Sequence, residues 1–174
     1  LDSNSIMNRA FYALPPLTNS EGVHTNAVYG FVNMLFKLYE EIKPDYVVAA
    51  FDRKAPTFRH TEYADYKAGR KKMPPELAEQ FPIIKEVFEA MAIKIFEIDG
   101  YEADDLIGTL ATFSERNDLE TYILTGDRDA LQLASDNIKV IITKKGVSEK
   151  EIYDRDRMIK DYGVTPKEFI DVKG

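Results

Sequence analysis

The sequence predicts an α/β fold in which helices cover both sides of a mostly parallel central sheet. Four short runs rich in apolar residues have strand length, at residues 46–51, 93–98, 121–125 and 138–143. The first run is apolar throughout, as in a strand that is buried on both faces. Helical patterns lie between the runs, and strands that alternate with helices pair in parallel. In such sheets, ligands bind beyond the carboxyl ends of the strands.

The helical patterns cover residues 25–42, 83–91 and 104–116, where apolar residues recur at helical spacing. Thr25 or Asn26 can cap the first of these helices, because both side chains carry an oxygen that accepts a backbone N–H. Leu1 has the character of the last residue of a further strand. These elements complete the predicted layers.

Length and composition exclude several classes of protein. A chain of 174 residues with 44% hydrophobic residues suits one folded domain. The absence of cysteine excludes disulfides and thiolate zinc sites, and His24 and His60 leave little material for a histidine-based mechanism. No apolar run approaches the roughly 20 residues of a membrane span, and the N-terminus lacks the apolar run of a signal peptide. We therefore expect a cytoplasmic protein.

Charge is distributed unevenly along the chain. The net charge of -7 disfavours a nucleic-acid partner at first, because phosphate binders are usually basic. Residues 53–72, however, hold seven basic and only two acidic residues, a local charge of +5. Part of the acidic excess elsewhere is a set of aspartates that a bound cation would neutralise.

Carboxylates follow the predicted strands at the ends where ligands bind. They come from four segments: Asp2, Asp52, the group Glu102, Asp104 and Asp105, and the pair Asp127 and Asp129. Each alone has an ordinary explanation as a helix cap or turn residue. Together at one edge they would repel one another and raise their pKa values, unless a hard divalent cation offset the charge. Oxygen ligands suit Mg²⁺ or Mn²⁺, so the sequence predicts such a metal site.

Other familiar sites do not fit the sequence. An EF-hand loop counted from Asp127 would place Gln132 where glycine is needed and Ile138 where the bidentate glutamate belongs. The sequence contains no phosphate-binding Walker loop, no dinucleotide-binding glycine motif and no zinc-protease motif.

The basic segment mixes cations with aromatic rings. Lys67 and Arg70 share a face if the segment is helical, and Lys71 lies beside them. Tyr63 and Tyr66 lie among them, a combination suited to phosphate contacts and base stacking. In isolation, the segment is better explained as a solvated charged helix. Its position directly after Asp52 favours phosphate chemistry, which needs both cations and metal.

Several blocks of this sequence resemble the 5′-nuclease domain of bacterial DNA polymerase I. They occur in the family's order: residues 9–15, 25–31, 51–52, 57–59, 66–70, 102–105 and 125–129. The blocks Glu-Ala-Asp-Asp and Thr-Gly-Asp-Arg-Asp are together highly specific. The resemblance implies a three-layer α/β/α, PIN-like domain over residues 1–174, with a helical arch at about 57–80.

The resemblance also implies hydrolysis of DNA phosphodiesters at 5′ ends and 5′ flaps in replication and repair, with two divalent metals. Asp2, Asp52, Glu102, Asp104 and Asp105 would hold the first metal, and Asp127 and Asp129 would help to hold the second. Lys67 and Arg70 would contact the scissile phosphate, with Tyr66 available for stacking. The remaining DNA-binding residues that we expect are Arg9, Arg53, Arg59 and Lys71.

The sequence departs from the family at two places. Ser3 stands where the family has glycine. The chain stops at Gly174, before the family's further metal-binding aspartates and its helix–hairpin–helix region. We interpret the chain as part of a longer nuclease, with or without a fused polymerase, and expect a monomer associated with the nucleoid. The alternatives are a PIN-like ribonuclease and a non-catalytic docking module.

Overall fold

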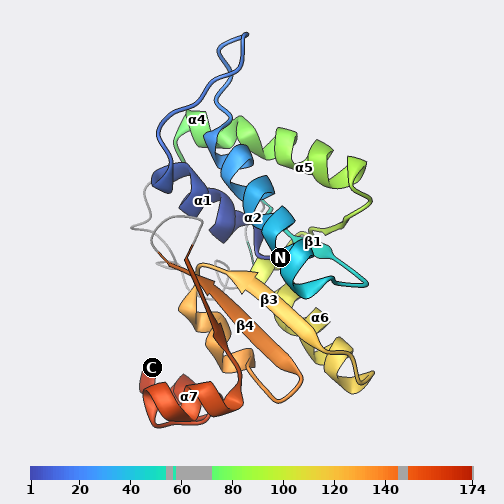
Figure 1. The fold of residues 1–174 in the computed structure, drawn as a ribbon, viewed down its shortest axis with the longest axis vertical. Helices are drawn as coiled ribbons and strands as arrows, with labels where there is room; N and C mark the ends of the chain where they lie inside the picture. The colour runs from blue at the N-terminus through green and yellow to red at the C-terminus, as the bar shows by residue number, and fades with distance from the viewer. Residues whose placement is uncertain (54–56, 58–71, 145–148, 174) are drawn as a thin grey trace.

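The computed structural model describes residues 1–53, 57, 72–144 and 149–173. Its helices and strands alternate along most of the chain (Figure 1). In order they are α1 (Ser3–Ala13), α2 (Asn26–Ile42), β1 (Val48–Ala50), α4 (Pro75–Ala78), α5 (Gln80–Ala90), β2 (Lys94–Phe96), α6 (Ala103–Arg116), β3 (Thr121–Thr125), the 3₁₀ helix η1 (Arg128–Leu133), β4 (Ile138–Thr143), β5 (Lys150–Tyr153), α7 (Arg155–Tyr162) and α8 (Phe169–Lys173). No helix in these ranges combines the length and apolar character needed to cross a membrane.

The strands form two groups. β1 pairs in parallel with β2, with Val48 opposite Lys94. β3 pairs in parallel with β4, with Thr121 opposite Ile138, and β5 adds to β4 in the antiparallel direction. The predicted parallel pairing is therefore confirmed, and the antiparallel β5 is an addition that the sequence did not indicate.

Leu1 and Asp2 lie between these two groups. The Ala50 N–H donates to the Leu1 carbonyl and the Asp2 N–H donates to the Leu124 carbonyl, each at 2.9 Å. Asp2 forms a parallel bridge with Ala50. The two residues thus occupy a strand position between β1 and β3, as the sequence predicted for Leu1, and Asp2 stands in the middle of the sheet.

The predicted strands differ in how closely the structure follows them. The runs 121–125 and 138–143 are β3 and β4 without change. The runs 46–51 and 93–98 shorten to three residues each, because the ladder between β1 and β2 contains only three residue pairs. Tyr46, at the start of the first run, is 83% exposed and takes no part in the sheet.

Alternating side chains divide the sheet into two buried faces. Leu124 of β3 and Ile141 of β4 belong to one hydrophobic core, together with residues of α1, α2 and α5. Their neighbours Ile123 and Val140 belong to a second core with α6 and α7. Figure 1 shows these helices on opposite sides of the sheet. This period of two confirms the predicted three-layer α/β/α arrangement.

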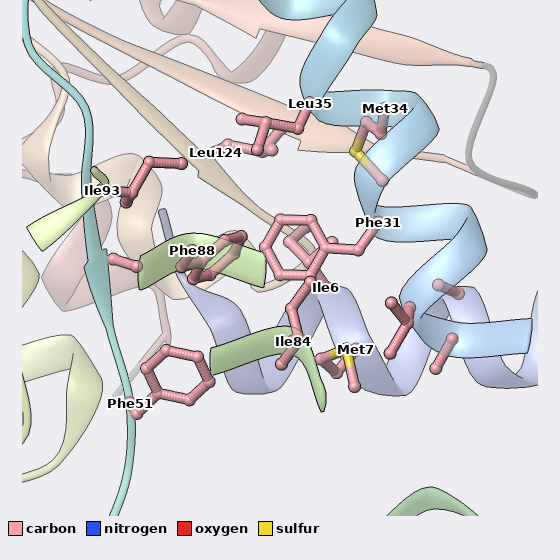
Figure 2. Close-up of a cluster of buried hydrophobic side chains, with 14 of the residues drawn as sticks. Ile6, Met7, Phe31, Met34, Leu35, Phe51, Ile84, Phe88, Ile93 and Leu124 are labelled. Atoms are coloured by element: carbon pink, nitrogen blue, oxygen red, sulfur yellow. The ribbon is translucent and has the colours of Figure 1, made fainter. Parts of the chain in front are cut away.

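Aromatic rings lie at the centre of the first core, and small residues line part of the second. In the first, Phe31 and Phe88 meet edge to face with ring centroids 5.2 Å apart, and Phe51 packs beside them (Figure 2). Burying a phenylalanine contributes about 1.5–3 kcal/mol. The second core contains the small residues Ala50, Ala103 and Ala111. Small residues let α6 lie close to the sheet, so its N-terminus reaches the edge that carries Asp2.

A buried amide fixes α4 and α5 against α2. The Gln80 side chain accepts hydrogen bonds from Ala27 N (2.8 Å) and Val28 N (3.2 Å) at the start of α2. It donates to Asn26 Oδ1 at 3.0 Å and to the Glu76 carbonyl at 2.8 Å. All four hydrogen-bonding positions of the amide are used. Residues 75–80, which fall within the range of the expected arch, therefore pack onto the core, and residues 58–71 of that range lie outside the described chain.

Candidate active site

Asp2 is the most deeply placed carboxylate of the predicted set. Only 4% of the residue is exposed. Its Oδ1 accepts the Ser5 N–H at 3.1 Å and so caps α1. Its Oδ2 accepts the Thr125 hydroxyl at 2.6 Å. Burial raises the pKa of Asp2, and these two hydrogen bonds oppose that rise. The fold thus supplies a specific hydrogen-bond donor to each carboxylate oxygen of Asp2.

Asp52 links the end of β1 to the start of α6. Its Oδ1 accepts the Ala103 N–H at 2.7 Å, and its own N–H donates to Asn4 Oδ1 at 3.0 Å. Glu102 and Asp105 form a capping box, in which each carboxylate accepts the other's backbone N–H. In this box the Glu102 N–H donates to Asp105 Oδ2 at 3.0 Å. Asp52, Glu102 and Asp105, which are all predicted metal ligands, therefore also cap the N-terminus of α6.

Asp127 and Asp129 follow β3 at the same edge. The Asp127 N–H donates to the Thr125 hydroxyl at 2.9 Å. The Asp127 carboxylate in turn accepts the Asp129 N–H at 2.9 Å, which caps η1. Asp129 is exposed and, with Asp2 and Thr125, lines a cavity of about 650 Å³ that also reaches Asp104 and Asp105.

Asp104 differs from the other carboxylates in its electrostatics. Loss of water around the group raises the pKa of Asp104 to about 6, and repulsion from nearby carboxylates adds to the shift. The carboxylates that repel it are Asp2, Asp127, Asp52 and Glu102. The structure therefore brings carboxylates from four separate segments close enough for their charges to repel, at the edge that the sequence indicated.

The carboxylates do not form a closed coordination shell. Among the described residues, no three His, Cys, Asp or Glu side chains are arranged as a group that could hold a metal ion as they stand. Like charges keep such side chains apart when no cation lies between them. The chemistry of the donor set still fits a hard divalent cation, since every donor is a carboxylate oxygen and the repulsion on Asp104 is uncompensated. The ligand assignment stays a prediction.

Two of the predicted DNA-binding residues already have protein partners. Arg53 Nε lies 3.0 Å from Asp99 Oδ1 in an ion pair with both side chains largely exposed. Arg9 donates from Nη2 to the Gly126 carbonyl at 3.0 Å and from Nη1 to the Lys144 carbonyl at 3.3 Å. Arg9 therefore ties α1 to the ends of β3 and β4. The predicted residues Arg59, Tyr66, Lys67, Arg70 and Lys71 lie outside the described part of the chain.

Close packing explains the glycine that precedes Asp127. A Cβ atom added at Gly126 would lie 2.7 Å from Arg9 Nε and 2.9 Å from Ser5 Oγ. The same Ser5 hydroxyl accepts the Gly126 N–H at 2.9 Å. Any side chain at this position would displace the Arg9 guanidinium and the Ser5 hydroxyl, both of which hydrogen-bond to the Gly126 backbone.

Three polar residues at the site were not identified from the sequence as functional. Asn4, Ser5 and Thr125 contact the backbone or side chains of the predicted ligands. Thr125 lies within the Thr-Gly-Asp-Arg-Asp block, which was the available signal. Asn4 and Ser5 lie outside the recognised blocks, and their side chains accept backbone N–H groups of Asp52 and Gly126, 48 and 121 residues away, which the sequence could not indicate.

This combination of fold and acidic edge defines a class of nuclease domain. Residues 1–163 match the family described as the 5′-3′ exonuclease, N-terminal resolvase-like domain, and the chain belongs to that family.

The chain is similar to one part of several longer proteins. It is 48% identical to DNA polymerase I of Bacillus subtilis over 174 residues, which cover 100% of this chain and 20% of that protein. It is 46% identical to DNA polymerase I of Mycobacterium bovis over 173 residues, covering 98% of this chain and 19% of the relative. The chain thus spans about a fifth of the relatives that it matches.

Solved structures share the fold. A T5 5′-exonuclease with bound divalent metal ions (zinc) superposes with a TM-score of 0.71 at 18% identity, over 99% of this chain and 63% of that one. A bacteriophage T5 flap endonuclease in a pseudo-enzyme–product complex with DNA and metal ions gives a TM-score of 0.72 at 19% identity, with the same coverage. These likenesses confirm the PIN-like α/β architecture.

Proposed function

We propose that this chain carries a divalent-metal-dependent 5′-nuclease activity that hydrolyses DNA phosphodiester bonds at 5′ ends and 5′ flaps. The observation that carries the proposal is the convergence of Asp2, Asp52, Glu102 and Asp127 around Asp104 at the carboxyl edge of the sheet. Carboxylates from separate segments rarely converge without a cation to offset their repulsion. Membership of the 5′-3′ exonuclease family supports the same conclusion.

Mg²⁺ or Mn²⁺ is the proposed cofactor, with two ions for each site. Asp2, Asp52, Glu102, Asp104 and Asp105 would hold one ion, and Asp127 and Asp129 would help to hold the other. Such a pair of ions supplies activation of water and stabilisation of the leaving oxygen. The metal ions named in the T5 structures support this assignment by analogy of fold.

The protein's own groups would orient the DNA. Lys67 and Arg70 would offset the charge that develops on the phosphate, and Tyr66 would stack on a base. Arg53 can exchange its exposed ion pair with Asp99 for a phosphate at little cost, because such pairs contribute only about 0–1 kcal/mol.

The proposed partner is DNA with a 5′ end, a flap or a junction between single and double strands. The relatives that are DNA polymerases support a covalently joined polymerase in the longer protein. We further propose a monomer that works in the cytoplasm at the bacterial nucleoid.

The test is Mn²⁺-dependent cleavage of a labelled 5′-flap DNA, with Asp104→Asn as the matched control. It should use both this 174-residue chain and the longest natural polypeptide that contains it. We expect cleavage that needs the metal and is lost in Asp104→Asn. Preference for single-stranded RNA over flap DNA would favour a PIN-like ribonuclease. A folded protein with no turnover at any metal concentration, in both forms, would favour a non-catalytic docking module.

A further inference from the structure

The Thr125 hydroxyl joins two carboxylate segments that are far apart in the sequence. Thr125 ends β3 and is 1% exposed. Its Oγ1 donates to Asp2 Oδ2 at 2.6 Å and accepts the Asp127 N–H at 2.9 Å. One oxygen atom therefore touches the side chain of Asp2, 123 residues away in sequence, and the backbone of Asp127.

The chemistry of a hydroxyl makes this link directional. A hydroxyl has a single hydrogen, and here that hydrogen is directed at Asp2. The Asp127 N–H occupies an acceptor position on the same oxygen. Because the residue is buried, water has no ready access to replace either bond. Loss of the hydroxyl would release one oxygen of Asp2 and the backbone nitrogen of Asp127 together.

Within the described part of the chain, Thr125 is the one residue whose hydrogen bond to Asp2 Oδ2 is seen. Ser5 N donates to Oδ1 at 3.1 Å, and the Thr125 hydroxyl donates to Oδ2. With both donors the plane of the carboxylate is defined, whereas with Ser5 alone the group can rotate. Thr125 also fixes the backbone of Asp127, the residue that caps η1, because the Thr125 hydroxyl accepts the Asp127 N–H.

We propose that Thr125 is a positioning residue, which sets the placement of Asp2 relative to Asp127 and so the spacing between the two cation positions. This inference rests on the proposed function, since it assigns these aspartates to different ions. Groups that orient metal ligands typically contribute 10-fold to 100-fold in metal affinity or activity. Thr125 acts through Asp2 and Asp127 and does not itself touch the substrate.

The experiment compares Mn²⁺ binding, measured by electron paramagnetic resonance without DNA, with the metal dependence of flap cleavage. T125V keeps the branched shape and removes the hydroxyl, whereas T125S keeps the hydroxyl. T143V is the matched control, because Thr143 is 2% exposed at the end of the neighbouring β4 and its Oγ1 has no hydrogen-bond partner in the described structure. Circular dichroism checks that each variant is folded.

We expect T125V to bind Mn²⁺ about 10-fold to 100-fold more weakly and to need correspondingly more metal for cleavage. T125S and T143V should bind Mn²⁺ as the wild type does. Wild-type affinity in a folded T125V overturns the inference while the proposed function stands. A wild-type protein that neither binds Mn²⁺ nor cleaves overturns both. Should T125V not fold, T125S still decides, because a 10-fold weaker affinity with the hydroxyl retained contradicts the inference.

Discussion

The carboxylates at the sheet edge are held in two different ways. Asp2, Asp52 and Asp127 each accept hydrogen bonds from the protein at 2.6–3.1 Å. For Asp104 the influences on its pKa are loss of water and repulsion from other acids, with no hydrogen bond among them. Both kinds of carboxylate lie within a few residues of a helix N-terminus, so helical position does not explain the difference.

The comparison separates two contributions to the site. Hydrogen-bonded carboxylates stabilise the fold through the donors that they satisfy, and the fold in turn fixes their positions. Asp104 carries a charge that the protein does not offset, so it costs stability when no cation is present. A site can therefore contain residues that hold the structure together and a residue that destabilises it, and substitutions should distinguish them.

The largest expected effect separates activity from stability at Asp52 and Asp104. Alanine at either position should reduce metal-dependent flap cleavage by at least about 100-fold, since even groups that only orient ligands contribute 10-fold to 100-fold. The two substitutions should differ in their effect on the free energy of unfolding. Asp52→Ala leaves the buried Ala103 N–H without its partner, at a cost of about 1–3 kcal/mol. Asp104→Ala removes repulsion and should not lower the free energy of unfolding in metal-free buffer.

Urea unfolding in the presence of a chelator measures that stability difference. If Asp104→Ala proves as destabilising as Asp52→Ala, the distinction between the two kinds of carboxylate is wrong, because Asp104 would then also stabilise the fold.

Substitutions at Gly126 and Gly108 test how tightly the residues around the hydrogen-bonded carboxylates are packed. Gly126→Ala would place a Cβ 2.9 Å from Ser5 Oγ and should destabilise the fold by about 1–3 kcal/mol. Gly108→Ala in α6 is the matched control, because its Cβ would meet only Leu133 Cδ2 at 3.7 Å. Alanine in that helix should stabilise by about 0.5–1 kcal/mol. Equal thermal midpoints for the two variants would show that the Arg9 and Ser5 side chains move aside from Gly126 without cost.

The pKa of Asp104 predicts a pH dependence of stability. The folded-state pKa of about 6 lies above the ordinary value of 3.8, so the folded chain binds more protons between these values. The free energy of unfolding of the metal-free protein should therefore fall as pH rises from about 4 to 6. We expect the contribution to be about 1 kcal/mol, reduced by solvent screening of this exposed side chain.

Asp104→Asn isolates this contribution, because the amide does not titrate. The difference in stability between variant and wild type should grow over that pH range in urea titrations. A constant difference would mean that Asp104 titrates normally.

The smallest expected effect concerns Ser3, the residue that follows Asp2. Ser3 is fully buried at the start of α1, and its hydroxyl has no partner among the described residues. Ser3→Ala should raise the free energy of unfolding by about 0.5–1 kcal/mol, because it removes an unsatisfied polar group. Ser5→Ala, in the same helix, should lower it, because Gly126 N loses its acceptor. Calorimetry on both variants checks the opposite signs.

The sequence predicted the layers and the acidic edge because both depend on local patterns. The run 121–125 could be assigned as a strand from its own residues, and Asp127 and Asp129 follow it in the chain. The links between segments were not predictable in this way. The sequence indicated Arg9 as a DNA-binding residue, which stays a prediction, but gave no sign that its side chain donates to carbonyls 117 and 135 residues away. Helix α1 was also missed, since its first turn begins with Ser-Asn-Ser and depends on the Asp2 cap.

The place of Leu1 and Asp2 in the sheet also determines when this protein can finish folding. Among the described residues, their backbone is hydrogen-bonded both to β1 and to the end of β3. The central strand position thus requires contacts that close loops of about 50 and 120 residues, and such non-local pairing slows folding. On the ribosome, Leu1 and Asp2 would emerge before β3 and would wait for it before the sheet is complete. The acidic edge would form only once β3 has been synthesised, when both sides of Asp2 are occupied.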